Sequence, residues 1–310
     1  MGFPKCGTTF LYKYLNTSES FILREEHCEM GTKPNKIKDL VFELHHHPHA
    51  GNLKMGIKCP REVETEYSLA NYGKFFPNAD FIVTTRHPVE WFESFYNFIA
   101  SRLWPNRLPR PEDLIGPCQF GGNPYVCTTG KDSCPIKSRN LCTDRGKFHH
   151  ALSRFGKTPM STEREINLLN HHNMSISTSK AKIFLVELNQ LNEEIDPIKG
   201  NIFRNDLRDF LGLKQDLPPM IPTEKKRKER SDERHEFFIN ICDAKHAALR
   251  HVLLQHGRDA SDWIREFFIH SPDVVVSSPD YFVELLRRWG QDPCDGGVPP
   301  GNYTEEGVIQ

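Results

Sequence analysis

The chain lacks an apolar run of the roughly 18–20 residues that a membrane-spanning helix needs. It also lacks an excess of charge of one sign, because 40 Lys and Arg stand against 41 Asp and Glu, a net charge of −1. This balance argues against a nucleic-acid-binding protein held by bulk positive charge. Charged residues at 26% and aromatic residues at 11% exclude disorder of the whole chain. The opening Met1-Gly-Phe-Pro-Lys5 has neither region of a signal peptide.

The nine cysteines include no pair two residues apart, which a zinc ribbon would normally show. Four of them gather in one stretch, at Cys118, Cys127, Cys134 and Cys142. We expect two disulfides among these four, with three pairings open; reduced or metal-bound thiols are the alternative. Disulfides imply an oxidising compartment. Three Asn-x-Ser/Thr triplets, which are compatible with secretion, begin at Asn16, Asn173 and Asn302.

The apolar pattern predicts strands that alternate with helices. Ala79–Thr85 and Lys182–Glu187 are β-rich runs typical of buried strands, and Leu53–Ile57 is a shorter candidate. Helical spacing occurs at Phe10–Leu15, Glu62–Phe76, Val89–Leu103, Ser161–His171, Asn201–Leu211, Phe237–Gln255 and Tyr281–Trp289. Such alternation predicts an α/β fold with a mainly parallel sheet covered on both faces.

The first candidate site is the glycine-bounded loop Gly2-Phe-Pro-Lys-Cys-Gly-Thr-Thr9. Glycines let backbone N–H groups curl around a phosphate ahead of a helix. A nucleotidase-type loop places Lys directly after the second glycine, but here that position holds Thr8 and the lysine is Lys5. The cation therefore approaches the anion from another side, and the two threonines offer hydroxyl donors. A tight turn before a helix is the alternative.

The second candidate is Arg86, which directly follows the strand predicted at Ala79–Thr85, together with Ser94 in the next helix. Ligands of open α/β sheets bind at the carboxyl ends of strands, so these two side chains are suited to hold one phosphate. A capping or salt-bridge role is the alternative for the arginine.

Together these motifs resemble the 3′-phosphoadenylyl-sulfate (PAPS)-dependent sulfotransferase family. The loop from Gly2 to Thr9 looks like the family's 5′-phosphosulfate loop, and Arg86-His-Pro-Val-Glu-Trp-Phe-Glu-Ser94 looks like its 3′-phosphate motif. Further on, Ile183–Leu191 and Phe210-Leu-Gly-Leu213 resemble its late strand and helix end. The order and spacing agree from Gly2 to about Leu213.

The resemblance implies transfer of a sulfuryl group from PAPS to a hydroxyl or amine, without a metal. Lys5 would stabilise the bridging oxygen of the leaving nucleotide. Cys6, Gly7, Thr8 and Thr9, the residues that follow Lys5 in the loop, would hold the 5′-phosphate.

Other residues of the site follow from the same resemblance. Arg86 and Ser94 would hold the 3′-phosphate. Lys58, in Lys58-Cys-Pro60, matches a Lys-x-Pro element whose lysine faces the reaction centre; a plain surface lysine is the alternative.

The acceptor needs a base to take its proton. Arg24-Glu-Glu-His27 resembles the Glu-x-His segment of Golgi glycan sulfotransferases, and the match places the general base at Glu25. Glu26 and His27 are the next candidates, and a solvated charge run is the alternative. The aromatic residues of the family segment are replaced by Cys28-Glu29.

Two further clusters are open to more than one interpretation. The basic run Lys225–Lys228 occupies the place of a loop over the 3′-phosphate, but it lacks the usual glycines, so a solvated run is the favoured interpretation. The histidines from His45 to His49 suggest a metal, yet consecutive histidines in a loop rarely make a preorganised site. We therefore expect no metal.

The expected protein is one sulfotransferase domain over residues 1–310, with a Cys-rich insertion at about 105–145 and an irregular tail from about 292. The resemblance implies a P-loop-like three-layer α/β/α fold. Because the loop begins at residue 2, we expect a sheet that lacks its first strand, and a membrane anchor in the missing segment.

A glutamate base resembles the Golgi branch of the family, so the resemblance implies a carbohydrate acceptor and a location in the Golgi lumen. No nucleic-acid partner is expected. The rival functions are a non-catalytic PAPS- or PAP-binding protein and a P-loop kinase of a small molecule.

Overall fold

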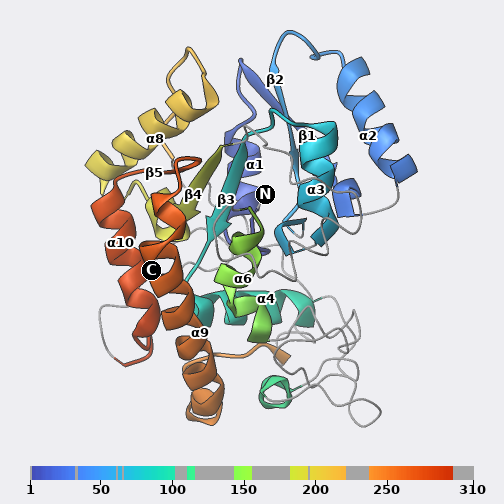
Figure 1. The fold of residues 1–310 in the computed structure, drawn as a ribbon. Helices are drawn as coiled ribbons and strands as arrows, with labels where there is room; N and C mark the ends of the chain where they lie inside the picture. Colours follow the sequence, from blue (N-terminus) through green and yellow to red (C-terminus); the bar gives the residue numbers. More distant parts are fainter. Residues whose placement is uncertain are drawn as a thin grey trace. The chain divides into compact units, whose positions relative to one another are not determined.

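The computed structural model describes residues 2–31, 34–60, 62–64, 66–101, 110–115, 143–155, 182–194, 196–220 and 237–295. Its strands are β1 (Ser20–Glu26), β2 (Lys54–Lys58), β3 (Phe81–Thr85), β4 (Ile183–Glu187) and β5 (Val274–Val276). Its helices are α1 (Thr8–Tyr14), α2 (Pro34–His46), α3 (Glu66–Phe75), α4 (Pro88–Ala100), α6 (Phe148–Leu152), α8 (Pro197–Leu211), α9 (Ala247–Glu266) and α10 (Pro279–Arg287). Figure 1 shows these elements along the chain.

The described chain divides into two compact units. The first takes in residues 2–85, 150–220 and 264–283, and it contains both sheets. The second takes in residues 86–149, 237–263 and 284–295, as far as they are described.

The larger sheet of the first unit is parallel, with the strand order β3-β4-β5. Every residue of β4 is buried, as expected for a central strand of a parallel sheet covered on both faces. Its register with β3 runs without a break from Phe81–Ile183 to Thr85–Glu187. The chain is therefore mixed α/β with parallel strands, as the sequence predicted.

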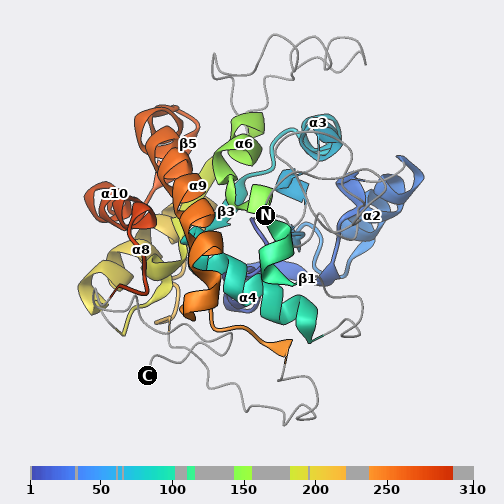
Figure 2. The same cartoon turned by 90° about the horizontal axis from the view of Figure 1, so that it is seen from below.

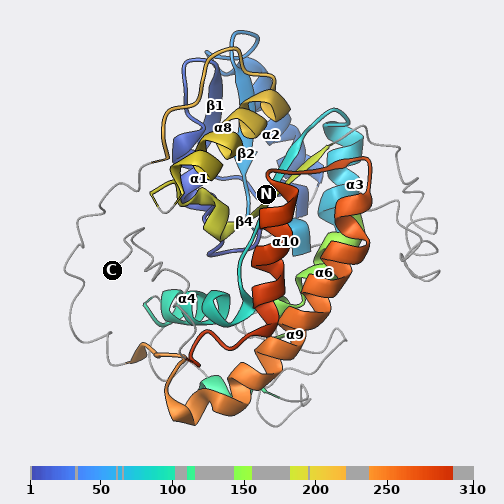
Figure 3. The ribbon, with the colours of Figure 1, turned by 90° about the vertical axis from the view of Figure 1, so that its left-hand side faces the viewer.

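Helices lie against both faces of this sheet. On one face, Phe184 and Val186 of β4 share a buried cluster with Leu11 of α1 and with Phe203 and Leu207 of α8. Figures 1 and 3 show the ribbons of α1 and α8 beside β4. On the other face, residues of odd number in β3 point away from this cluster, because side chains alternate along a strand.

The core of that second face is aromatic. The ring of Phe81 in β3 lies 5.1 Å from the ring of Tyr72 in α3 and 5.5 Å from that of Phe155. These edge-to-face contacts attach α3 and the segment after α6 to the sheet.

The smaller sheet pairs β1 with β2, again in parallel. Its register is interrupted: Ile22 lies opposite Gly56, but Glu26 lies opposite Lys58. Four positions along β1 thus span two along β2, which is a bulge that bends β1 before its last residue.

The second unit is built around aromatic side chains of α4. Trp91 lies 5.7 Å from Phe148, which lies 5.5 Å from Trp289, in both cases with rings nearly perpendicular. A side chain on Gly257 of α9 would lie 2.4 Å from the carbonyl oxygen of Trp289 and 3.5 Å from Pro88, so only glycine allows this approach. Figure 2 shows α4 and α9 of this unit.

Most predicted elements occur, with shifted bounds. The strand predicted at Ala79–Thr85 is β3, and that at Lys182–Glu187 is β4. The helix predicted at Asn201–Leu211 begins four residues earlier, because Asp196 caps it and Pro197 suits its first turn. It ends at Gly212, whose φ of 63° is the expected left-handed cap.

The prediction at Phe237–Gln255 was wrong in its bounds. The helix there, α9, begins only at Ala247 and continues to Glu266, after irregular chain and a short 3₁₀ turn. Among the described helices and strands, the sequence interpretation missed β1, α2, α6 and β5. The helix predicted at Ser161–His171 lies outside the described residues.

Candidate functional site

The loop from Gly2 to Thr9 joins the edge of the larger sheet to α1. Gly2 forms a parallel bridge to Thr84, and the Phe3 N–H donates to the Thr84 carbonyl at 3.2 Å. A Cβ on Gly2 would lie 2.3 Å from the Thr84 hydroxyl oxygen, so glycine is required for this approach. The loop is therefore attached to β3 at the carboxyl half of that strand.

The loop then turns through two left-handed residues. Lys5 has a φ of 67° and Gly7 a φ of 77°. A lysine in this region costs on the order of 1–2 kcal/mol, which glycine avoids. Such strain at a non-glycine residue is common at ligand-binding turns, and it agrees with a functional role for Lys5.

Between these two residues the Cys6 thiol is buried, and Gly7 precedes the first turn of α1 as its N-cap. An added Cβ on Gly7 would lie 2.6 Å from Leu188. Thr8 is buried, whereas Thr9 is exposed and available to a ligand.

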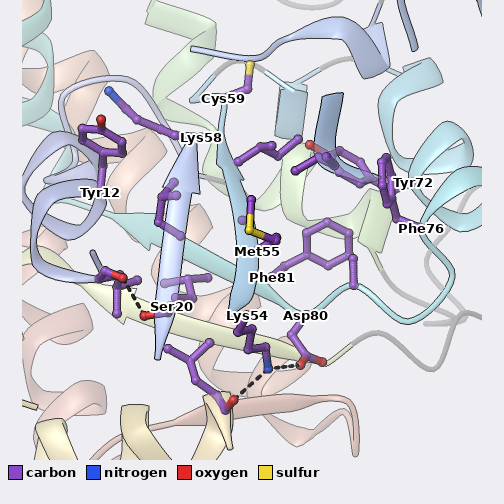
Figure 4. A pocket seen from close by; sticks show the side chains of 18 of the residues that line it. Tyr12, Ser20, Lys54, Met55, Lys58, Cys59, Tyr72, Phe76, Asp80 and Phe81 are labelled. Carbon is purple, nitrogen blue, oxygen red and sulfur yellow. Dashed lines mark hydrogen bonds and ion pairs between the residues drawn. The ribbon is translucent and has the colours of Figure 1, made fainter. Parts of the chain in front are cut away.

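Lys58 brings three predicted elements of the site together. Its amine donates to the Thr9 hydroxyl at 3.0 Å and to the Glu26 carboxylate at 2.8 Å. The same amine lies 6.0 Å from the centre of the Tyr12 ring, toward which it points in Figure 4. The Lys-x-Pro element, the loop and the acidic segment therefore meet at one amine.

The acidic segment forms the end of β1. Glu25 is a residue of this strand, but its side chain is not among those described, so its role as base stays a prediction. Glu26, the next candidate, is the carboxylate that pairs with Lys58; its side chain is 53% exposed and therefore open to a substrate. His27 lies 3.6 Å from Glu29.

Behind these residues lies a disulfide that the sequence interpretation missed, between Cys28 and Cys59. Cys28 comes two residues after Glu26 and Cys59 directly after Lys58. The only sequence signal was the position of Cys28, where the family pattern has an aromatic residue.

A buried carboxyl group supports the same region. Glu62 accepts a hydrogen bond from the Met30 N–H at 2.8 Å and another from the Tyr72 hydroxyl. Burial raises the pKa of Glu62 to about 7, against the partial opposition of these hydrogen bonds. Asn71 adds a hydrogen bond of 2.6 Å to the Met30 carbonyl.

Arg86 and Ser94 belong to the second unit and are described within it. Arg86 is buried and forms an ion pair with Glu90 at 3.4 Å. Glu90 lies one turn before Ser94 on the same side of α4. The next residue, His87, caps α4, and burial lowers its pKa. The structure thus gives Arg86 the ion pair that was its alternative interpretation, while a phosphate-binding role stays a prediction.

A cavity of about 490 Å³ lies in the first unit, lined by both β2 and β3 (Figure 4). Its walls are mainly apolar, with Met55 and Ile57 from β2 and Phe81 and Ile82 from β3. At one end of the cavity Lys54 donates to Asp80 and to the Leu211 carbonyl. Lys58 is also among the residues that line the cavity.

The expectation of a sheet without its first strand stays a prediction.

Several other predictions fall elsewhere. The four cysteines 118–142, Lys225–Lys228 and the triplets at Asn173 and Asn302 lie outside the described residues. The second observed disulfide joins Cys242 and Cys294. Asn16 of the first triplet donates to the Tyr12 carbonyl and accepts from the Ile22 N–H.

Two histidines of the run from His45 to His49 stack on aromatic rings: the ring centre of His46 lies 3.8 Å from that of Phe42, and the ring centre of His47 lies 4.7 Å from that of Phe21. Within the described ranges, no three His, Cys, Asp or Glu side chains form a group able to hold a metal ion. Nor does any helix in those ranges have the length and apolar character to cross a bilayer.

The two disulfides of the described residues indicate an oxidising environment of the secretory type.

No protein-family model matches the chain, and a search of curated proteins finds no significant match. The functional assignment therefore depends on the chain's own residues.

Proposed function

We propose that this protein is a sulfotransferase that moves a sulfuryl group from PAPS to a hydroxyl or amine. The observation that carries the proposal is the position of the Lys58 amine, 3.0 Å from Thr9 and 2.8 Å from Glu26. Transfer to an acceptor oxygen needs groups that stabilise developing negative charge and a base that takes the acceptor's proton. The Lys58 amine and the Thr9 hydroxyl are suited to the first task, and the exposed carboxylate of Glu26 is suited to the second.

The loop is assigned to the 5′ end of the donor. Gly7 and Lys5 turn the backbone through left-handed conformations, and the Thr9 hydroxyl is exposed beside them. Backbone N–H groups in such a turn form a concave site for an anion. By the resemblance, Cys6, Gly7, Thr8 and Thr9 hold the 5′-phosphate, and Arg86 and Ser94 hold the 3′-phosphate.

The transfer itself breaks one bond and forms one. The acceptor oxygen attacks the sulfur in line, the sulfur–oxygen bond to the 5′-phosphate breaks, and that oxygen keeps the electron pair. Lys5, with Lys58, stabilises the negative charge that develops on the leaving oxygen. A carboxylate takes the acceptor's proton, so a hydroxyl acceptor yields a sulfate ester and an amine acceptor a sulfamate, with PAP as the other product.

The base is Glu25 by residue-to-residue match with the family segment. Glu26 is the alternative, and its contact with Lys58 favours it, because that contact places its carboxylate beside a cation of the site. Lys58 would then serve two functions: it would stabilise developing charge and orient the base.

The proposal includes the type of fold, the acceptor and the cellular location. A P-loop-like three-layer α/β/α arrangement is supported by α1 and α8 on one face of the parallel sheet and Tyr72 of α3 on the other. A carbohydrate acceptor and the Golgi lumen are supported by the glutamate-rich end of β1 and by the disulfides.

Three parallel measurements separate the candidate functions: sulfuryl transfer from PAPS, binding of PAP, and phosphoryl transfer from ATP. Purified protein is incubated with PAPS carrying a labelled sulfuryl group and with a panel of sugars and phenols. Labelled product without added metal supports the sulfotransferase, and binding of PAP without product supports a binding protein. Magnesium-dependent phosphoryl transfer from ATP would instead show a kinase.

A further inference from the structure

The ends of β1 and β2 are joined in two ways. The backbone N–H of His27 donates to the Lys58 carbonyl at 3.0 Å, and Cys28 is disulfide-bonded to Cys59. The bond thus connects the residue after Lys58 to the second residue after Glu26. Figure 4 shows Lys58 and Cys59 as neighbours at this end of β2.

The strand pairing alone fixes this end of the sheet weakly. The register shifts between Ile22 and Glu26, so the regular ladder from Ser20 to Ile22 does not determine which residue faces Lys58. A slip of one residue along β1 would move the side chain that faces Lys58 to the other face of the strand. The Glu26–Lys58 pair lies beyond the bulge, on the side of the disulfide.

The chain next to the disulfide is also held by hydrogen bonds that do not depend on it. Glu62 and Asn71 bind the N–H and the carbonyl of Met30, and Met30 is fully buried. The chain after Cys28 therefore stays attached to α3 when the disulfide is opened. Opening it is expected to release the strand ends without unfolding the unit.

We propose that the Cys28–Cys59 disulfide is a positioning element that holds the Lys58 amine against Thr9 and Glu26. The proposal rests on the proposed function for its catalytic part only. A dithiol reductant opens the bond by thiol–disulfide exchange: two thiols form on the protein, and the reductant becomes a cyclic disulfide. Reduction then lowers turnover, because the amine and its carboxylate lose their fixed geometry.

The test compares the double variant Cys28→Ser/Cys59→Ser with the matched control Cys242→Ser/Cys294→Ser, which removes the disulfide of the second unit. The first measurement is independent of activity: the rate at which an amine-reactive ester labels Lys58, followed by peptide mass spectrometry. Lys54, at the other end of β2, is the internal reference.

We expect the labelling rate of Lys58 to rise about threefold in the first variant and to stay unchanged in the control. Threefold corresponds to the loss of one partly exposed ion pair. We also expect kcat to fall about tenfold while KM for PAPS is retained, because misplacement of a positioned group affects the reacting geometry.

Each result decides one part. Unchanged labelling of Lys58 overturns the positioning role, whatever the activity. Faster labelling with unchanged kcat overturns its catalytic part. Faster labelling in a protein whose wild type transfers no sulfuryl group supports the positioning role and contradicts the proposed function instead.

If the first variant does not fold, the same labelling is done on the control variant after graded reduction with a dithiol. Alkylation mapping then reports the fraction of Cys28–Cys59 that is open, and Lys58 labelling must rise with that fraction for the proposal to stand.

Discussion

Lys58 and Glu26 face each other as the last pair of a parallel two-stranded sheet, with their charged atoms 2.8 Å apart. They are 32 residues apart in sequence and adjacent only because β1 and β2 run side by side. Thr9, in the first turn of α1, completes the contact through its hydroxyl. This meeting of three segments is the structural basis of the proposed site.

Replacement of Lys58 tests the importance of its amine. Lys58→Met keeps much of the length of the side chain but removes the charge, so we expect kcat to fall about 100-fold, the loss typical of one electrostatic contact to developing charge. Steady-state kinetics with labelled PAPS measure it. Lys38→Met, at an exposed position of α2, is the control and should keep wild-type activity. Equal activity of both variants would remove Lys58 from the mechanism.

The identity of the base is tested by two parallel variants. Glu25→Gln and Glu26→Gln each remove one carboxylate at nearly constant size. The variant that loses the base is expected to lose on the order of 100-fold in kcat, since general-base catalysis contributes about that much, and to keep its affinity for PAP. The resemblance predicts this for Glu25 and the ion pair favours Glu26. Full activity of both would point to His27.

The sequence predicted the elements that carry strong local patterns. The run Phe81-Ile-Val-Thr-Thr85 is rich in apolar and β-branched residues, and β4 is apolar up to its last residue, Glu187, so both strands could be recognised without tertiary information. The loop was recognisable because Gly2 and Gly7 are needed for its backbone conformation.

The elements that were missed depend on tertiary contacts. β1 ends in Arg24-Glu-Glu26, whose charges suggested a solvated run, yet its pairing with β2 makes it a strand. β5 has only three residues and is a strand because it lies beside β4. The Cys28–Cys59 bond joins residues 31 apart, and sequence alone does not choose among pairings of nine cysteines.

The loop glycine is the subject of a stability prediction. Gly7→Ala places a Cβ 2.6 Å from Leu188 at a φ of 77°, whereas Gly212→Ala meets nothing within 4 Å at a φ of 63°. Both variants carry the left-handed penalty of about 1–2 kcal/mol, but only Gly7→Ala adds overpacking of about 1–3 kcal/mol. Urea unfolding should therefore show a greater loss for Gly7→Ala. Equal losses would mean that the loop and Leu188 move apart freely.

Glu62 gives the protein a stability that depends on pH. Its pKa is about 7 in the folded protein against an ordinary value of 4.5, so the folded state holds the proton more tightly. The stabilisation is full below about pH 4.5 and is lost as the pH rises through 7, with a total change of about 3 kcal/mol.

Urea unfolding at a series of pH values checks this prediction. Glu62→Gln should flatten the decline in the free energy of unfolding between pH 5 and pH 8. The part of the decline that is removed should be about 1.4 kcal/mol for each unit by which the pKa of Glu62 is raised. Glu43→Gln, at an exposed position of α2, should leave the decline as it is. A Glu62→Gln profile parallel to that of the wild type would assign the decline to other groups.

The most direct test of the sulfotransferase assignment is the rate of label transfer from PAPS by wild type and by Lys5→Ala, with Lys13→Ala on the exposed side of α1 as control. We predict transfer by the wild type and the control, and a loss of about 100- to 1,000-fold for Lys5→Ala, the effect of removing one group that stabilises the leaving oxygen. Transfer by Lys5→Ala at the wild-type rate would contradict the assignment.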